Sequence, residues 1–147
     1  MKPVQAVLFT LWFVIAGCAT ADEADASKEP ASIAQGQSAF TDNCAACHGA
    51  SGAGDGIVAS VLKPTVPDLT ALCAKNDGVF PAESVYKIID GRTQFAAHGT
   101  RLMPIWGMEF WLDEGADERA DVRVAEKIHQ LVAYLETLAL NCTRREG

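Results

Sequence analysis

A C-x-x-C-H motif constrains this chain more than any other feature of its sequence. Cys44 and Cys47 are three residues apart, and His48 follows the second cysteine directly. Ile33 and Phe40 precede the motif at helical spacing, so the motif ends a helical pattern. Two sulfurs one helical turn apart can each form a thioether with a haem vinyl group, and the next residue then lies under the iron. The spacing is the attachment signature of a c-type haem.

Two other chemistries use closely spaced cysteines, and the sequence favours neither. A thioredoxin-like dithiol needs a strand–helix–strand context, whereas this motif ends a helical pattern. A zinc site needs a second cysteine or histidine pair at close range, and the sequence has none. The motif therefore predicts one covalently bound haem c.

A haem with two protein ligands needs a second ligating residue downstream of His48. Met103 is followed by Pro104 in a segment rich in glycine and loop residues, and proline fixes the backbone beside the sulfur. Plain core packing is the alternative role for a methionine. We therefore predict His48 and Met103 as the axial iron ligands. Met108 is the reserve ligand, and His98 follows it.

The N-terminal sequence predicts export. Lys2 precedes an apolar run of about a dozen residues that ends in small residues, which is typical of a signal peptide at residues 1–21. A membrane-spanning helix would need about 20 apolar residues. The acidic stretch 22–31 has little to bury and is expected to be a disordered tether, and residues 32–147 are expected to form one domain. These features place the protein in the periplasm.

Two cleavage sites are compatible with this signal. The residues before Cys18 resemble the lipobox of bacterial lipoproteins, in which the cysteine becomes the lipidated N-terminus. An ordinary A-x-A site ends at Ala21 instead. The protein is therefore expected either to be anchored to a membrane through Cys18 or to be freely soluble in the periplasm.

Charge limits the partners of the chain. The formal net charge is −7 at pH 7, which argues against nucleic acid because that ligand requires a basic surface. Opposite fields speed protein encounter, so the expected partners are redox proteins with a basic docking patch.

The remaining cysteines predict a disulfide. The chain has five cysteines, and stray thiols are uncommon after export to an oxidising compartment. With Cys18 lipidated or removed, and Cys44 and Cys47 used together, Cys73 and Cys142 are left as one pair. Two separate buried thiols are the alternative.

Local signals predict an all-α fold with roughly three to five helices. Pro81 and Gly91 bracket a helix of about nine residues. Another helix is expected to begin between Asp117 and Asp121, either of which could cap it, and to end near Asn141. The segments between the helices, including the one that carries Met103, show no strand-like alternation and are expected to be loops that wrap a flat cofactor. Within them, Arg92 could pair with a haem propionate or stay solvated.

These motifs together resemble one known family. The stretches "GQSAFTDNCAACHG", "GDG", "PDLT", "IIDGR", "LMPIWG" and "LVAYL" are similar to those of the class I c-type cytochromes, small mono-haem electron carriers. The resemblance implies the small cytochrome c fold around one covalent haem. It also implies that Cys44 and Cys47 form the thioethers and that His48 and Met103 bind the iron.

The resemblance extends to the helix packing and has one departure. Gly36, Phe40 and Tyr134 match the positions where the family packs its N-terminal helix across its C-terminal helix. Many relatives have proline after "GDG", where this chain has Ile57. If the carbonyl of that proline orients the ligand histidine, another carbonyl must do so here, near Pro64 or Pro67.

The expected function is electron transfer rather than enzyme catalysis. A haem iron with two protein ligands offers no position to a substrate and can only exchange single electrons with periplasmic or membrane redox partners. Two alternatives stay open: a haem subunit of a periplasmic dehydrogenase, and a catalytic haem protein of peroxidase type in which Met103 does not hold the iron.

Overall fold

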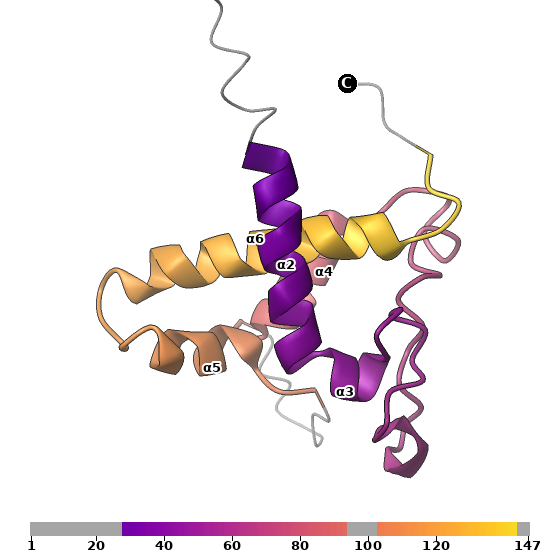
Figure 1. Cartoon of the computed structure of the whole chain (residues 1–147), viewed down its shortest axis with the longest axis horizontal. Helices are drawn as coiled ribbons and strands as arrows, with labels where there is room; N and C mark the ends of the chain where they lie inside the picture. Colours follow the sequence, from indigo (N-terminus) through magenta and orange to yellow (C-terminus); the bar gives the residue numbers. More distant parts are fainter. Residues whose placement is uncertain (1–27, 94–102, 144–147) are drawn as a thin grey trace, which may run out of the picture.

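The computed structural model describes residues 28–93 and 103–143, and every regular element in these two stretches is a helix (Figure 1). This confirms the all-α class. In chain order the elements are α2 (Lys28–Asn43), α3 (Ala45–His48), the 3-10 helix η1 (Ala59–Val61), α4 (Ala82–Asp90), α5 (Trp106–Asp113) and α6 (Ala120–Leu138).

The start of α2 bears on the expected tether. The helix begins at Lys28, so residues 28–31, which we assigned to the tether, are helical. The signal peptide, with Cys18 and its cleavage sites, and residues 22–27 lie outside the described residues.

The fold is organised around the crossing of α2 over α6, which Figure 1 shows directly. At the crossing a Cβ atom on Gly36 would lie 1.9 Å from the backbone oxygen of Gln130, so only glycine lets the two backbones approach this closely. The rings of Phe40 and Tyr134 pack beside this point with centroids 5.4 Å apart. The three residues therefore sit where the family resemblance implied.

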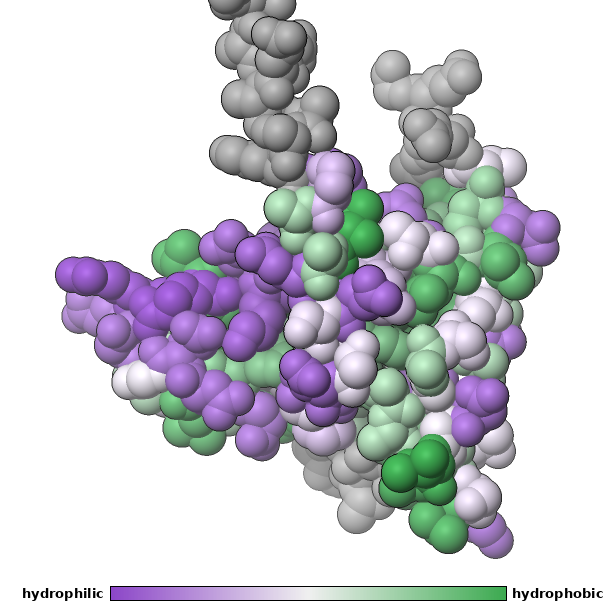
Figure 2. All heavy atoms as spheres, in the orientation of Figure 1, coloured by the Kyte–Doolittle hydropathy of each residue, from purple (hydrophilic) through white to green (hydrophobic). Residues whose placement is uncertain are grey.

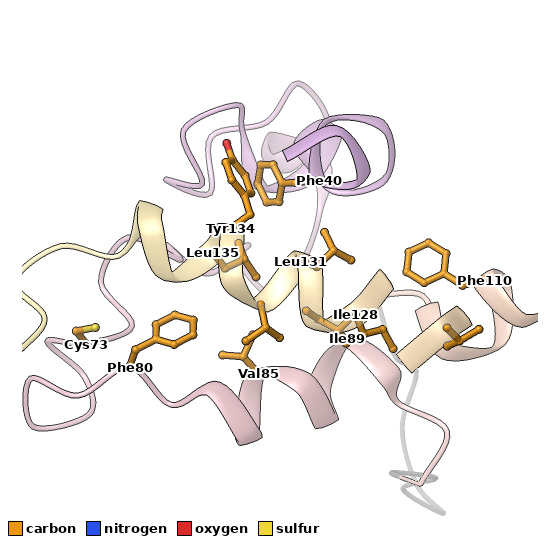
Figure 3. Packing of buried hydrophobic residues seen from close by; sticks show 12 residues of the cluster. Phe40, Cys73, Phe80, Val85, Ile89, Phe110, Ile128, Leu131, Tyr134 and Leu135 are labelled. Atoms are coloured by element: carbon orange, nitrogen blue, oxygen red, sulfur yellow. The ribbon is translucent and has the colours of Figure 1, made fainter. Parts of the chain in front are cut away.

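The hydrophobic core lies along α6, between α2 on one side and α4 on the other (Figure 3). Ile128 and Leu131 of α6 are fully buried, and Val85 and Ile89 of α4 pack against them. Phe110 of α5 closes one end of this core. The apolar stripe of α6 is thus covered by three helices, which fixes the frame on which the loops are mounted.

The structure confirms one helix prediction and adjusts another. Helix α4 spans Ala82–Asp90, as the Pro81 and Gly91 signals predicted. Helix α6 begins at Ala120, within the expected range, but the expected aspartate cap is wrong, because the N-cap residue is Arg119 and it makes no side-chain cap. Asp117 only accepts a hydrogen bond from the Arg119 amide, at 2.9 Å. The helix ends at Leu138, earlier than the expected end near Asn141.

The prediction of a loop around Met103 is wrong in part, because residues 106–113 form helix α5. Ile105 precedes it and makes no side-chain cap, so no capping signal marks its start. A Cβ on Gly107 would lie 2.3 Å from an Asp90 carboxylate oxygen, which shows how closely the start of α5 approaches the end of α4. Tertiary packing therefore stabilises this helix where local signals are weak.

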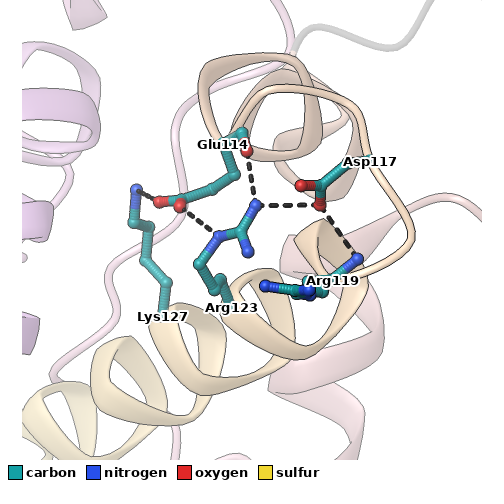
Figure 4. Close-up of polar contacts among 5 residues, drawn as sticks. All are labelled: Glu114, Asp117, Arg119, Arg123 and Lys127. Carbon is teal, nitrogen blue, oxygen red and sulfur yellow. Dashed lines mark hydrogen bonds and ion pairs between the residues drawn. The ribbon is translucent and has the colours of Figure 1, made fainter.

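Charged residues gather at the α5–α6 turn, over which the surface in Figure 2 is strongly hydrophilic. The Glu114 carboxylate accepts a hydrogen bond from Arg123 Nε at 2.8 Å and pairs with Lys127 at 3.1 Å, as Figure 4 shows. Arg123 also reaches Asp117, at 3.0 Å. The Lys127 and Arg123 donors hold the pKa of Glu114 below its ordinary value.

Cys73 and Cys142 form a disulfide, as the cysteine count predicted, with their Cα atoms 5.2 Å apart. It joins the segment before α4 to the segment after α6. Cys73 is fully buried, so the bridge is also a part of the core.

Candidate functional site

The C-x-x-C-H residues lie at the junction of α2 and α3. The His48 amide donates to the Cys44 carbonyl at 2.9 Å, and the Cys47 amide reaches the same oxygen at 3.1 Å. This single helical turn brings the two sulfur-bearing residues to one side. Both cysteines are free thiols in the structure and are half-buried. Burial, with a smaller contribution from Cys47, raises the pKa of Cys44 to about 12, so this thiol stays protonated in a chain without haem.

His48 is held by a backbone carbonyl. Its Nδ1 atom lies 3.4 Å from the Pro67 oxygen, within hydrogen-bonding reach. A proton on Nδ1 leaves Nε2 as the free ligating atom. Burial lowers the pKa of His48, and the Pro67 contact opposes this effect. Pro67, rather than Pro64, therefore supplies the carbonyl that faces His48.

Met103 lies against the same cavity as the C-x-x-C-H residues. The cavity has a volume of about 170 Å³. Its walls include all four predicted site residues, together with apolar side chains from residues 62–66 and from the start of α5: Cys44, Cys47, His48, Met103, Leu62, Pro64, Val66 and Trp106. Residues far apart in the sequence thus converge on one apolar space.

Met108 and His129, two other side chains that could bind iron, do not line this cavity. Met108 is 40% exposed on α5. His129 is exposed on α6, where its ring packs on Tyr86 at a centroid distance of 4.8 Å. His98 lies outside the described residues. Met103 is therefore the methionine that the described residues place at the cavity of His48.

Arg92 has protein partners of its own. Its side chain pairs with Asp90 at 2.7 Å and with Asp121 at 2.6 Å. The sequence left open a haem propionate or solvent as its surroundings, and the structure pairs Arg92 with two carboxylates. Arg92 instead ties the end of α4 to the start of α6.

A larger cavity, of about 970 Å³, lies between the N-terminal end of α2, the start of α4 and the end of α6. None of the four predicted site residues lines it, and three exposed carboxylates, of Glu29, Glu83 and Glu136, lie along it. Its size exceeds that of the cavity at Met103, but it has no sulfur or imidazole group other than the oxidised Cys142. The ligand chemistry is therefore in the smaller cavity.

The donor groups around the smaller cavity suit a haem rather than a bare metal ion. In the stretches 28–93 and 103–143, no three or more His, Cys, Asp or Glu residues are grouped so as to hold a metal ion. Two free thiols, one imidazole and one thioether instead face an apolar space. These are the groups that a c-type haem requires for covalent attachment and for two axial positions, and apolar walls suit a flat macrocycle.

The helical fold and this cavity define a c-type cytochrome. Residues 31–135 match the family model described as cytochrome c oxidase, cbb3-type, subunit III, and the chain belongs to that family. Its domain binds haem c covalently and serves electron transfer rather than catalysis, which confirms the expected cofactor and the expected non-enzymatic class. Searches of curated proteins and of solved structures found no significant match.

Proposed function

We propose that this protein is a mono-haem electron carrier of the periplasm, in which Cys44 and Cys47 hold the haem and His48 and Met103 are its axial ligands. The observation that carries the proposal is the meeting of these four side chains at one apolar cavity. Bound haem c supplies a reversible one-electron Fe(III)/Fe(II) couple.

Each residue of the cavity has a distinct part in this function. The two cysteines fix the cofactor covalently, so that it is not lost to solvent. His48, oriented by Pro67, and Met103 together fill both axial positions and leave none for a substrate. A thioether ligand favours the ferrous state and raises the reduction potential relative to a second histidine. The apolar walls exclude water and so favour the less charged ferrous state, which also raises the reduction potential.

The surface beside α3 is suited to contact with a redox partner. Ile57 and Val61 are 89% and 79% exposed, and their segment is fastened to α3 by a hydrogen bond from the Val58 amide to the Ala46 carbonyl, at 3.1 Å. Figure 2 shows hydrophobic residues at this corner of the molecule and hydrophilic ones over the opposite end. The net charge of −7 would attract a partner with a basic patch, and the apolar corner would then make the close contact.

The matched family favours one alternative. Its description names a subunit of a cytochrome c oxidase, so this chain could work as a haem subunit held in a larger complex rather than as a free shuttle. The set of haem ligands is the same in both cases, and native molecular mass after mild extraction separates them. A catalytic haem protein is disfavoured, because Met103 lies at the cavity where an open iron would be needed.

Export and anchoring complete the proposal. Residues 1–21 would act as a signal peptide if cleavage follows Ala21. If the signal instead ends before Cys18, a lipidated Cys18 would hold the domain at a membrane surface through residues 19–27. No helix in the described part of the chain is long and apolar enough to cross a bilayer. Tethering would raise the effective concentration of the carrier at a membrane-bound partner.

Two ligand variants and one control test the proposed site. His48→Ala should abolish the accumulation of stable holoprotein. Met103→Ala should retain the haem but give a high-spin ferric spectrum, or one with a replacement ligand, and should lose the sulfur-to-iron charge-transfer band. Met108→Ala, the same substitution at an exposed methionine, should keep the wild-type spectrum. A wild-type spectrum in Met103→Ala would overturn the assignment of this ligand.

A further inference from the structure

The segment after α6 is fastened at three points to the segment that precedes α4. Cys142 is bonded to Cys73, and the Leu140 amide donates to the Thr70 carbonyl at 2.9 Å. The Thr143 amide donates to the Gly78 carbonyl at 2.7 Å. We call these three links the C-terminal clamp. They attach residues 70–78, which contain no regular helix, to the end of the longest helix of the domain.

The clamped segment begins next to the carbonyl that faces the proximal histidine. Asp68 follows Pro67, and its carboxylate accepts hydrogen bonds from the Thr70 hydroxyl at 2.7 Å and from the Thr70 amide at 2.9 Å. Leu69 is held from the other side, because its amide donates to the Gly52 carbonyl at 2.8 Å. A continuous set of bonds therefore runs from the clamp through Thr70 and Asp68 to Pro67.

The clamp supplies rigidity that local structure does not. Residues 62–81 form no helix, and an isolated loop of this kind is mobile by default. Yet the Pro67 carbonyl must stay within hydrogen-bonding reach of His48 Nδ1, which lies 3.4 Å away. A covalent bridge to a buried position restricts the conformations of this loop, and Cys73 is fully buried.

We infer that the C-terminal clamp positions the Pro67 carbonyl on His48 and thereby sets the donor strength of the proximal ligand. The inference rests on the proposed role of His48. A hydrogen bond from Nδ1 to a carbonyl makes the imidazole a stronger donor through Nε2. A stronger donor stabilises the ferric state and lowers the reduction potential. Loosening the clamp therefore shifts the potential to more positive values, although no clamp residue touches the iron.

The test compares reduction potentials of holoproteins. Cys73→Ala/Cys142→Ala should keep the haem and the low-spin spectrum, but its midpoint potential should be more positive than that of the wild type. The His48 Nδ1 proton, followed by NMR in the ferrous state, should exchange faster with solvent. Asp68→Ala keeps the disulfide and removes the carboxylate that links Thr70 to Pro67. It should therefore shift both quantities in the same direction, and it decides the matter if the double variant does not fold.

A matched control separates positioning from general loss of stability. Val85→Ala shortens a core side chain of α4 that is 6% exposed and belongs to none of these links. It should lower the unfolding temperature and leave the potential and the Nδ1 exchange rate unchanged. Wild-type potentials and exchange rates in both the double cysteine variant and Asp68→Ala would overturn the inference. A normal holoprotein yield and spectrum in His48→Ala would instead refute the proposed function.

Discussion

Replacing Gly36 by alanine should destabilise the protein strongly, because the crossing of α2 and α6 leaves no room for a methyl group. The added Cβ would lie 1.9 Å from the Gln130 oxygen and 2.9 Å from the Tyr134 Cβ. The oxygen belongs to the backbone of a helix and cannot rotate away. The two helices must therefore move apart, and this movement also separates the Phe40 and Tyr134 rings, whose centroids are 5.4 Å apart.

The size of the effect follows from three contributions. Overpacking against backbone belongs at the upper end of the usual range, about 3 kcal/mol. Loss of the aromatic contact adds about 1 kcal/mol. Alanine is a better helix former than glycine, and this offsets about 1 kcal/mol of the destabilisation. The free energy of unfolding should therefore fall by about 3 kcal/mol, which corresponds to a drop of about 12 °C in the unfolding temperature for a domain of this size.

Thermal unfolding of the oxidised holoprotein, followed by far-ultraviolet circular dichroism, measures this effect. Ser38→Ala is the control, because Ser38 is an exposed residue of the same helix and the substitution changes propensity without a clash. It should leave the unfolding temperature unchanged or raise it slightly. If Gly36→Ala unfolds at the wild-type temperature, the inference that α2 and α6 leave no room for a methyl group is wrong.

Three further predictions concern other parts of the molecule. Alkylation of the denatured holoprotein without reductant should label neither Cys73 nor Cys142, and labelling of both would exclude the bridge. Replacing both cysteines should lower the free energy of unfolding by about 4 kcal/mol according to the chain-entropy model. Glu114→Gln should destabilise the fold at neutral pH. Because the pKa of Glu114 is lowered in the folded state, its contribution to stability is present above the unfolded pKa and is lost as the pH falls through the folded pKa. The free energies of unfolding of the two proteins, measured by urea titration, should therefore become equal at low pH. A difference that stays constant with pH would show that the charge of Glu114 is not involved. Cys18→Ser should move the protein from the membrane fraction to the soluble fraction or block its processing, and a soluble wild type beginning at residue 22 would exclude the lipid anchor.

Local sequence signals predicted the helices that have clear start and stop residues or a clear apolar stripe. Pro81 and Gly91 marked α4 because proline suits a helix start and glycine a helix end. The apolar stripe of α6 was visible because it has to cover a core on one face only. Helix α5 was missed for the opposite reason. It has no side-chain cap and contains Gly107, which weakens a helix locally, while its contact with Asp90 depends on the tertiary fold.

The site was predictable to the extent that its chemistry is encoded in neighbouring residues. The C-x-x-C-H spacing indicates haem attachment without knowledge of the fold, and the proline beside Met103 singled out that methionine. The carbonyl that faces His48 could be narrowed only to Pro64 or Pro67, because the choice depends on the path of a loop without regular structure. The surroundings of Arg92 were ambiguous because its partner Asp121 is far from it in the sequence, on another helix.

The central claim is that this protein carries single electrons on a haem with two protein ligands. An anaerobic potentiometric titration of the purified holoprotein, followed by absorption from the Soret region to the far red, tests it most directly. The account predicts one Nernstian one-electron transition, low-spin spectra in both states, and a sulfur-to-iron charge-transfer band in the ferric state that disappears on reduction. A high-spin spectrum in either state, or a ferric spectrum without that band, would contradict it.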